Sequence, residues 1–200
     1  MQYRGQTPGS GAGKRRIRAP RKSVAERLDD GELTHEEAFD AAREALLRIL
    51  TAAQKSRREL EQALARKGYP ESVVMPLLER FDEVGLVDDA AYAGTIVRTR
   101  HGERGLARRA ISAELRRRGI DEDTATEALD QIDPDDERAA GARLAEKLVT
   151  RTRGLDRDVR VRRAVGSLAR KGYAPGLAFE LVREALAADG EDTGDLPYGD

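Results

Sequence analysis

The sequence contains no cysteine and no tryptophan, and aromatic residues make up only 4% of its 200 residues. Without cysteine, the chain has no disulfide framework, no thiolate metal ligand and no cysteine nucleophile. With so few aromatic residues, any core must consist mainly of Ala, Leu, Val and Ile. No apolar run reaches the roughly 20 residues that a membrane-spanning helix needs, and the N-terminus lacks the apolar region of a signal peptide. These absences predict a soluble, cytoplasmic protein without a membrane partner.

Side chains suited to catalysis or metal binding are also scarce. The two histidines, His35 and His101, have no partner at metal-ligand spacing. The glycine-rich stretch at 9–13 lacks both the Lys-Ser/Thr continuation and the preceding strand of a phosphate-binding loop. Paired aspartates such as Asp88-Asp89 stand at predicted helix starts, where capping is the more frequent role. We therefore expect no catalytic residue, no metal site, no cofactor and no enzymatic activity.

Charge is abundant but unevenly distributed. Charged residues make up 36% of the chain, and the net charge is −1. Residues 1–28 carry eight Lys or Arg against one Glu, which is +7, whereas residues 187–200 carry five acidic residues and no base. Both ends are polar and lack apolar periodicity, so we expect a disordered basic arm at 1–33 and an acidic tail at 187–200. The arm either contacts nucleic-acid phosphates or only aids solubility; the residues concerned are Lys14, Arg15, Arg16, Arg18, Arg21 and Lys22.

Between these ends, a helix-glycine-helix pattern occurs three times. Its glycines, Gly68, Gly119 and Gly172, stand 51 and 53 residues apart. A leucine precedes each glycine by four residues and another apolar residue precedes it by eight, which places both on one helical face. Apolar residues at helical spacing also follow each glycine. Three copies in step at a nearly constant period indicate a true repeat.

Helix-start signals place one further helix before each of these pairs. Capping boxes begin at Thr34 and Ser56, Asp88 opens the central copy, and Asp133-Pro134 opens the third. No segment shows the alternation typical of a strand. The sequence therefore predicts an all-α fold in which three three-helix modules form an elongated curved rod. The modules cover residues 34–86, 87–133 and 134–186.

The helices that end at the three glycines are rich in arginine. Cations in a last turn favour the helix dipole, but Arg108 and Arg109 lie too early in their helix for that explanation. A solvated face is the plain alternative; a partner-binding basic face is the interpretation we favour. Its predicted members are Arg98, Arg100, Arg108, Arg109, Arg116, Arg117, Arg162 and Arg163. Arg109, Arg116 and Arg117 recur at spacings that predict a common side of the helix. Asp88, Asp89, Gly105 and Gly119 are predicted to shape the backbone.

The stretch from Gly85 to Ile120 resembles the central signature of the RecX family. The resemblance rests on Gly85-Leu86-Val87-Asp88-Asp89, Tyr92-Ala93, the Arg98/Arg100 pair, Gly105, Ile111 through Glu114-Leu115, and Gly119-Ile120, and extends over about residues 36–186. RecX proteins are bacterial regulators of the RecA recombinase. The resemblance implies a cytoplasmic protein of DNA repair, recombination and the SOS response that binds the RecA filament on single-stranded DNA. It further implies inhibition of RecA's ATP hydrolysis, strand exchange and coprotease activity. We expect a monomer, and leave direct DNA contact open.

Two alternatives come from other functional classes. The segment from Leu115 to Leu129 is similar to a helix-turn-helix, which would make the protein a sequence-specific DNA binder. Its second helix, however, begins with Asp121, Glu122 and Asp123, which repel phosphates and do not read base edges. The other alternative is a general helical scaffold that binds peptides. Co-sedimentation with a RecA–DNA filament separates this scaffold from the favoured function.

Overall fold

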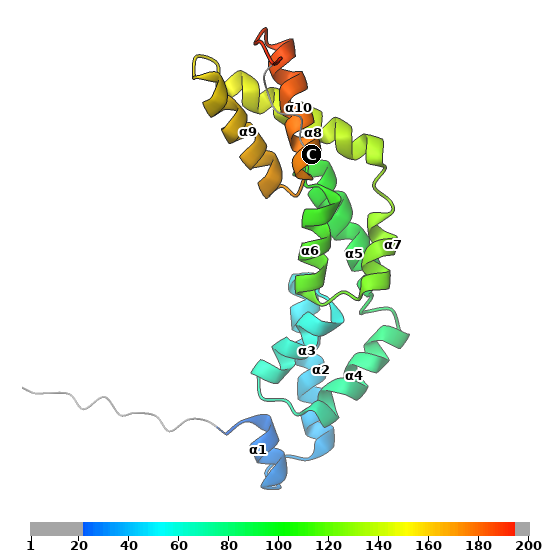
Figure 1. Cartoon of the computed structure of the whole chain (residues 1–200). Helices are drawn as coiled ribbons and strands as arrows, with labels where there is room; N and C mark the ends of the chain where they lie inside the picture. Colours follow the sequence, from blue (N-terminus) through cyan, green and yellow to red (C-terminus); the bar gives the residue numbers. More distant parts are fainter. Residues whose placement is uncertain (1–21, 195–200) are drawn as a thin grey trace, which may run out of the picture.

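A computed structural model describes residues 22–194, and all regular secondary structure in that range is helical. Figure 1 shows the helices as an elongated, curved rod, which confirms the predicted all-α array. The elements are α1 (Val24–Asp29), α2 (His35–Ala52), α3 (Arg57–Arg66), α4 (Glu71–Glu83), α5 (Asp89–Arg98), the π-helical turn η1 (Thr99–Glu103), α6 (Arg108–Arg118), α7 (Glu122–Leu129), α8 (Pro134–Arg151), α9 (Arg157–Arg170) and α10 (Pro175–Ala188).

The buried side chains form three separate hydrophobic cores along the rod. Helices α2–α4 enclose the first, α5–α7 the second and α8–α10 the third. We call these trios modules 1, 2 and 3. The leucines that precede the three glycines by four residues are fully buried in their respective cores: Leu64, Leu115 and Leu168. The repeated apolar pattern therefore marks one core in each module.

Several helices begin where their capping residues predict. Thr34 and Ser56 each form a complete capping box with the glutamate three residues later. The Asp88 carboxylate accepts a hydrogen bond from the Ala91 backbone N–H at 2.8 Å. Asp133 caps α8, with proline at the first helical position. These local hydrogen bonds satisfy backbone donors that a helix start leaves free.

The repeated glycines end the second helix of each module in a left-handed conformation. Gly68, Gly119 and Gly172 have φ angles of +85°, +80° and +92°. Another segment also approaches each of them closely. A Cβ at Gly172 would lie 2.6 Å from Ala110 of α6, and one at Gly119 would collide with the Arg58 side chain of α3. Glycine is required by both its backbone angle and the close approach.

At the junction of modules 1 and 2, the start of α3 meets the end of α6. The Ser56 hydroxyl donates to the Arg118 carbonyl at 2.5 Å. The Arg57 backbone N–H donates to the Asp89 carboxylate of α5 at 2.8 Å. A free donor at the helix start is thus satisfied from the next module.

The junction of modules 2 and 3 is built in the same way. Here the start of α6 meets the end of α9, and the Ala107 N–H donates to the Lys171 carbonyl at 2.9 Å. The Arg108 N–H donates to the Glu137 carboxylate of α8 at 2.8 Å. Ala107 is packed into the core of module 3 although it belongs to the module 2 segment. The repeat therefore extends to the contacts that hold neighbouring modules together.

The prediction of a disordered arm over 1–33 is wrong for its last part, because residues 24–29 form α1. A capping box of Ser23 and Glu26 opens this helix, and Leu28 packs against the first core. The Ala25 N–H donates to the Gly68 carbonyl at 3.0 Å. On module 1, α1 thus makes the kind of contact that α3 makes on module 2 and α6 makes on module 3. It is an N-terminal cap of the array.

The predicted acidic tail (187–200) is also wrong in its first residues. Helix α10 continues to Ala188, and both Asp189 and Glu191 form ion pairs with Arg160 of α9, whose side chain is only 2% exposed. In the repeat, Arg160 corresponds to Ser56 and Ala107, which are buried at a junction. At this position in module 3, Asp189 and Glu191 cover the Arg160 side chain.

Candidate protein-binding face

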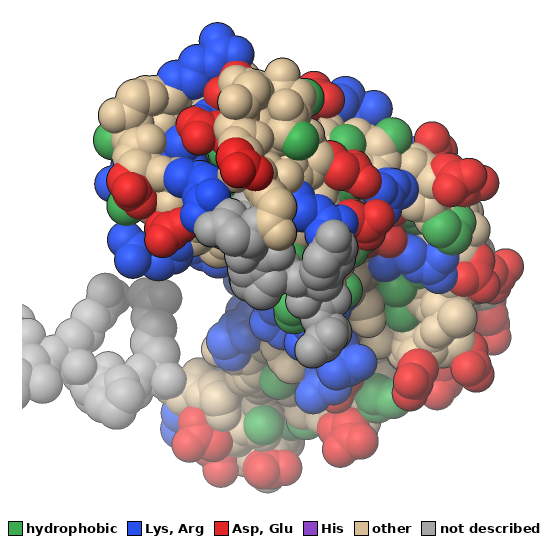
Figure 2. All heavy atoms as spheres, turned by 45° about the horizontal axis from the view of Figure 1, so that its top comes forward, with side chains coloured by type: hydrophobic (Ala, Val, Ile, Leu, Met, Phe, Trp, Pro, Cys, Tyr) green, Lys and Arg blue, Asp and Glu red, His purple; other side chains and the backbone are tan. Residues whose placement is uncertain are grey.

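Charge is segregated by helix position within the modules. The second helices α3, α6 and α9 have net charges of +1, +4 and +4, whereas the third helices α4, α7 and α10 have −3, −3 and −1. Figure 1 places α3 and α6 along one side of the rod and α4 and α7 along the other. In Figure 2, Lys and Arg side chains lie in the hollowed middle of the face shown, and many Asp and Glu side chains lie along its right-hand edge.

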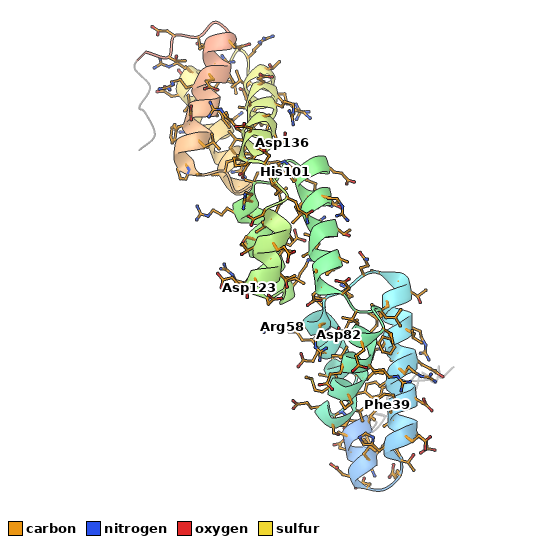
Figure 3. The ribbon with its side chains drawn as sticks, turned by 90° about the vertical axis from the view of Figure 1, so that its right-hand side faces the viewer. Phe39, Arg58, Asp82, His101, Asp123 and Asp136 are labelled. Atoms are coloured by element: carbon orange, nitrogen blue, oxygen red, sulfur yellow. The ribbon has the colours of Figure 1, made fainter. Side chains whose placement is uncertain are left out.

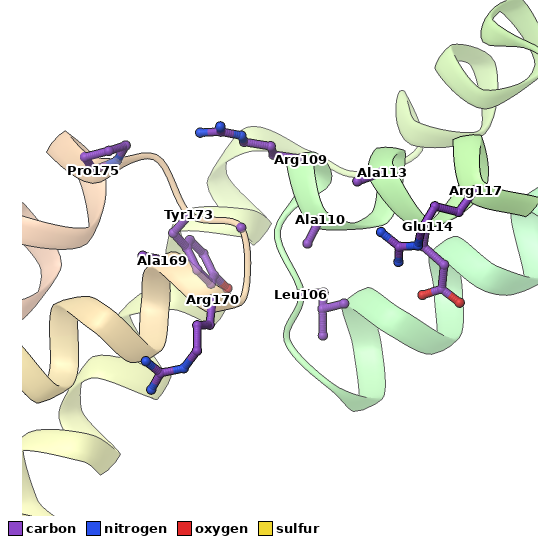
Figure 4. A pocket seen from close by; sticks show the side chains of 11 residues that line it. Leu106, Arg109, Ala110, Ala113, Glu114, Arg117, Ala169, Arg170, Tyr173 and Pro175 are labelled. Atoms are coloured by element: carbon purple, nitrogen blue, oxygen red, sulfur yellow. The ribbon is translucent and has the colours of Figure 1, made fainter.

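A cleft of about 590 Å³ lies where α6 meets α9 and the start of α10. Its lining is partly apolar, from Leu106, Ala110 and Ala113 on one side and Ala169 and Pro175 on the other. The close-up in Figure 4 shows Arg109 and Arg117 of α6 and Arg170 of α9 around it, with Tyr173 between the two sides. The cleft is thus an apolar hollow surrounded by arginines.

The three arginines of the cleft carry charge that the described chain does not neutralise. Arg109, Arg117 and Arg170 are exposed, and none forms an ion pair or hydrogen bond within residues 22–194. Arg170 was not among the predicted contact residues. It lies in the last turn of α9, where the helix dipole alone explains a cation. The position of Arg170 in the cleft follows from the fold, which brings α9 beside α6.

Glu114 also lines the cleft, but other side chains compensate its charge. Arg100 donates to its two carboxylate oxygens, each at 2.8 Å, and Arg118 donates at 2.8 and 3.2 Å. The Arg100 guanidinium, assisted by Arg118, lowers the pKa of Glu114 from 4.5 to about 2. Glu114 therefore stays ionised at neutral pH while contributing little negative potential to the cleft.

Arg118 connects this site to module 1. Its guanidinium donates to the Tyr92 hydroxyl at 2.6 Å and to Glu59 of α3 at 3.3 Å. The same group lies 5.6 Å from the centre of the Tyr92 ring, within cation–π range. Because Glu59 belongs to module 1 and Tyr92 to module 2, Arg118 stabilises the junction.

The predicted contact arginines differ in whether they have partners within the described residues. Arg100 is held by Glu114, and Arg108 donates to Asp130 at 2.7 Å and to a backbone carbonyl. Both are therefore occupied within the chain. Arg98 donates to the Thr95 hydroxyl at 3.2 Å and remains exposed. The remaining predicted arginines are exposed and unpaired within the described residues: Arg109, Arg116, Arg117, Arg162 and Arg163.

The prediction that Arg109, Arg116 and Arg117 share one surface is only partly right. Arg109 and Arg117 line the cleft at α9, whereas Arg116 lines a different hollow of about 270 Å³ between α6 and α7. Helices on both sides of α6 divide its exposed surface. On α9, Arg162 and Arg163 precede Arg170 by eight and seven residues, spacings that return near one helical face. The basic surface therefore continues from the cleft along α9.

The other predicted residues have structural partners or lie outside the described range. Asp89 accepts from Arg57 across the junction, and burial raises its pKa. Gly105 has a φ of +57°, and its carbonyl accepts from the Tyr173 hydroxyl at 3.2 Å. Lys22 pairs with Asp30 and Glu32, each at 2.5 Å. The remaining arm residues precede residue 22: Lys14, Arg15, Arg16, Arg18 and Arg21.

Figure 3 gives a side view of both junctions. Arg58 lies at the first junction, and His101 and Asp136 lie together at the second, where they line a hollow of about 270 Å³. Across residues 22–194, no three His, Asp or Glu side chains are grouped as a metal site. No helix in that range has the length and apolarity needed to cross a membrane.

Comparison with known proteins gives consistent matches. Family models for the first and second three-helix domains of RecX match residues 42–81 and 88–129. A protein from Thermobifida fusca named regulatory protein RecX is 47% identical over 84% of this chain and 90% of its own length. One of the same name from Streptomyces coelicolor is 45% identical over 77% and 82%. The crystal structure of RecX from Lactobacillus salivarius aligns with a TM-score of 0.68 at 23% identity, covering 76% of this chain and 99% of that one.

Proposed function

The chain belongs to the RecX family, and on that premise we propose that it is a non-enzymatic regulator that binds the RecA filament on single-stranded DNA. Binding would inhibit RecA's ATP hydrolysis, strand exchange and coprotease activity. The protein would act as a monomer in the bacterial cytoplasm. The observation that best supports this proposal is the row of exposed arginines on α6 and α9 that have no partner within residues 22–194: Arg109, Arg117, Arg162, Arg163 and Arg170.

The shape of the molecule suits a long partner. Three modules in a row, each with its own core and in contact with its neighbours, present more length than a globule of equal mass. Several weak contacts spread over such a surface add up to tight binding, because each contact raises the local concentration for the next. Bound along the filament, the rod would exclude an incoming duplex and a protein substrate. Contacts to adjacent RecA subunits would also restrain the movements that accompany ATP hydrolysis.

The charge distribution argues against the helix-turn-helix alternative. In that motif the second helix enters the major groove, which is flanked by phosphates. Here the helix in that position is α7, with a net charge of −3. A DNA contact made by the basic second helices, or by the arm, remains compatible with filament binding.

The proposal is tested by co-sedimentation with RecA filaments assembled on single-stranded DNA, together with RecA ATPase measurements. The wild-type protein is expected to pellet with filaments and to slow ATP hydrolysis. The double variant Arg109→Glu/Arg163→Glu is expected to do both at least tenfold more weakly. Arg80→Glu/Arg151→Glu makes the same charge change at two exposed arginines of α4 and α8 and serves as the control. Failure of the wild-type protein to bind filaments would refute the proposal.

A further inference from the structure

We infer that the cleft between α6 and α9 binds an acidic segment of a partner protein. One apolar side chain of that segment enters the cleft, and carboxylates on either side of it pair with the surrounding arginines. This inference rests on the proposed function, in that the partner segment is expected to belong to RecA. It names the chemistry of the contact and the place on the rod where it forms.

The size and lining of the cleft favour an apolar side chain. Its volume of about 590 Å³ lies within the usual range of binding pockets. Small residues keep it open, since Ala110, Ala113 and Ala169 all line it. At the other junction, the Arg58 side chain lies against Gly119, whereas the atoms nearest to Gly172 belong to Ala110. Arg109, which matches Arg58 in the repeat, lines the cleft.

The arginines favour carboxylates next to that apolar side chain. Arg109, Arg117 and Arg170 have no counter-charge within the described chain, and guanidinium groups bind carboxylates through paired hydrogen bonds. The one acidic residue in the lining, Glu114, is already held by Arg100 and Arg118 and so does not compete for them. The cleft is therefore positive around an apolar floor.

The lining gives less support for single-stranded nucleic acid as the occupant. Proteins that hold single strands stack the bases on accessible aromatic rings. The aromatic residue of this cleft, Tyr173, is 2% exposed, and its hydroxyl is bonded to the Gly105 carbonyl. Its burial raises the tyrosine pKa to about 12, so the hydroxyl stays protonated as a donor. The apolar remainder of the lining suits an aliphatic side chain better than a phosphate.

Two variants test the cleft by different means. Ala113→Trp fills it without changing charge, and Ala41→Trp makes the same change at an exposed position on α2. Arg170→Glu reverses one of its charges, and Arg80→Glu makes that reversal on α4. Both cleft variants are expected to bind RecA filaments at least tenfold more weakly than wild type, while the two controls bind as wild type does. Because Arg170 is exposed, its variant remains informative even if Ala113→Trp lowers stability.

A zero-length crosslink identifies the occupant. Lysine in the variant Arg170→Lys can be joined by a carbodiimide to a carboxylate in direct contact, and mass spectrometry then locates the joined residue. Arg80→Lys is the control. The expected product links residue 170 to an Asp or Glu of RecA that has an apolar neighbour in sequence. A product with DNA, a product only within this chain, or no product from a pelleted complex would overturn the inference.

The outcomes separate the two proposals. If wild-type protein does not bind filaments, the proposed function fails. If wild type binds and both cleft variants bind equally well, filament binding stands and the inference about the cleft is wrong.

Discussion

Replacing Glu114 with glutamine is expected to destabilise the protein by about 2 kcal/mol at pH 7. The substitution keeps the shape of the side chain but removes the charge that Arg100 and Arg118 share. The Glu114 and Arg100 side chains are only 14% and 18% exposed, so water compensates little for the loss. The pKa of Glu114 falls from 4.5 to about 2 on folding, which corresponds to roughly 3 kcal/mol at full value. Screening by solvent at this partly open site reduces the expected effect.

The effect should depend on pH in a definite direction. Because folding lowers the pKa of Glu114, its ionised form stabilises the native state above the unfolded-state pKa near 4.5. That stabilisation declines as the pH falls from about 5 towards 2, where the native carboxylate is protonated too. The free-energy difference between wild type and Glu114→Gln should therefore be largest at neutral pH. By pH 3 it should have fallen to less than half of that value.

Urea unfolding followed by circular dichroism at pH 7, 5 and 3 measures both effects. Glu61→Gln is the matched control, since Glu61 is exposed on α3 and forms no ion pair within the described residues. Equal stability of wild type and Glu114→Gln at pH 7 would refute the argument, and so would a difference that does not change with pH. Arg100→Ala should likewise destabilise the protein, whereas Arg109→Ala should leave unfolding unchanged, because only Arg100 is bound internally.

Two further variants test the ends and junctions of the rod. Gly172→Ala should lower the free energy of unfolding by about 2–4 kcal/mol, because its methyl group would lie 2.6 Å from Ala110. Gly154→Ala, at a similar φ of +85° but with open space around it, should lower it by only about 1 kcal/mol. Thermal unfolding compares the two variants. Leu28→Ala in α1 should lower the free energy of unfolding by about 1–2 kcal/mol, whereas Leu47→Ala, at a residue that is 43% exposed, should change it by no more than about 0.5 kcal/mol. Equal effects of the two substitutions would mean that α1 does not pack on module 1.

The parts of the fold that were predictable from sequence depend on local signals. A left-handed glycine such as Gly119, a cap such as Asp88 and a buried leucine such as Leu115 can each be recognised from a few neighbouring residues. Because these signals occur in all three modules, the order of the helices could be predicted. Helix α1 carries a capping box of Ser23 and Glu26, but its six residues are too few to show apolar periodicity. Its stability depends on packing against module 1, including the hydrogen bond from Ala25 to Gly68, which is far away in the sequence.

The partners of the individual arginines could not be predicted from the sequence. Arg100 and Arg109 look alike in sequence, yet the first pairs with Glu114, 14 residues away, and the second has no partner within the described chain. Arg116 and Arg117 are adjacent but line different hollows, because separate helices pack on the two sides of α6. Arg160 occupies a repeat position that holds serine and alanine elsewhere, and its ion pairs with Asp189 and Glu191 explain the difference. The environment of each of these arginines depends on residues of other helices, which the sequence of its own helix does not specify.

The likeness of the two junctions has a consequence for how such chains can change in length. Each junction needs only a glycine at the end of one second helix and a small residue at the start of another, together with an acidic residue on the adjoining first helix. A duplicated or deleted trio would restore the same contacts at the new boundary, provided that α1 stayed at one terminus and the Arg160 ion pairs at the other. The reach of the molecule can therefore grow or shrink in whole units without redesign of any core.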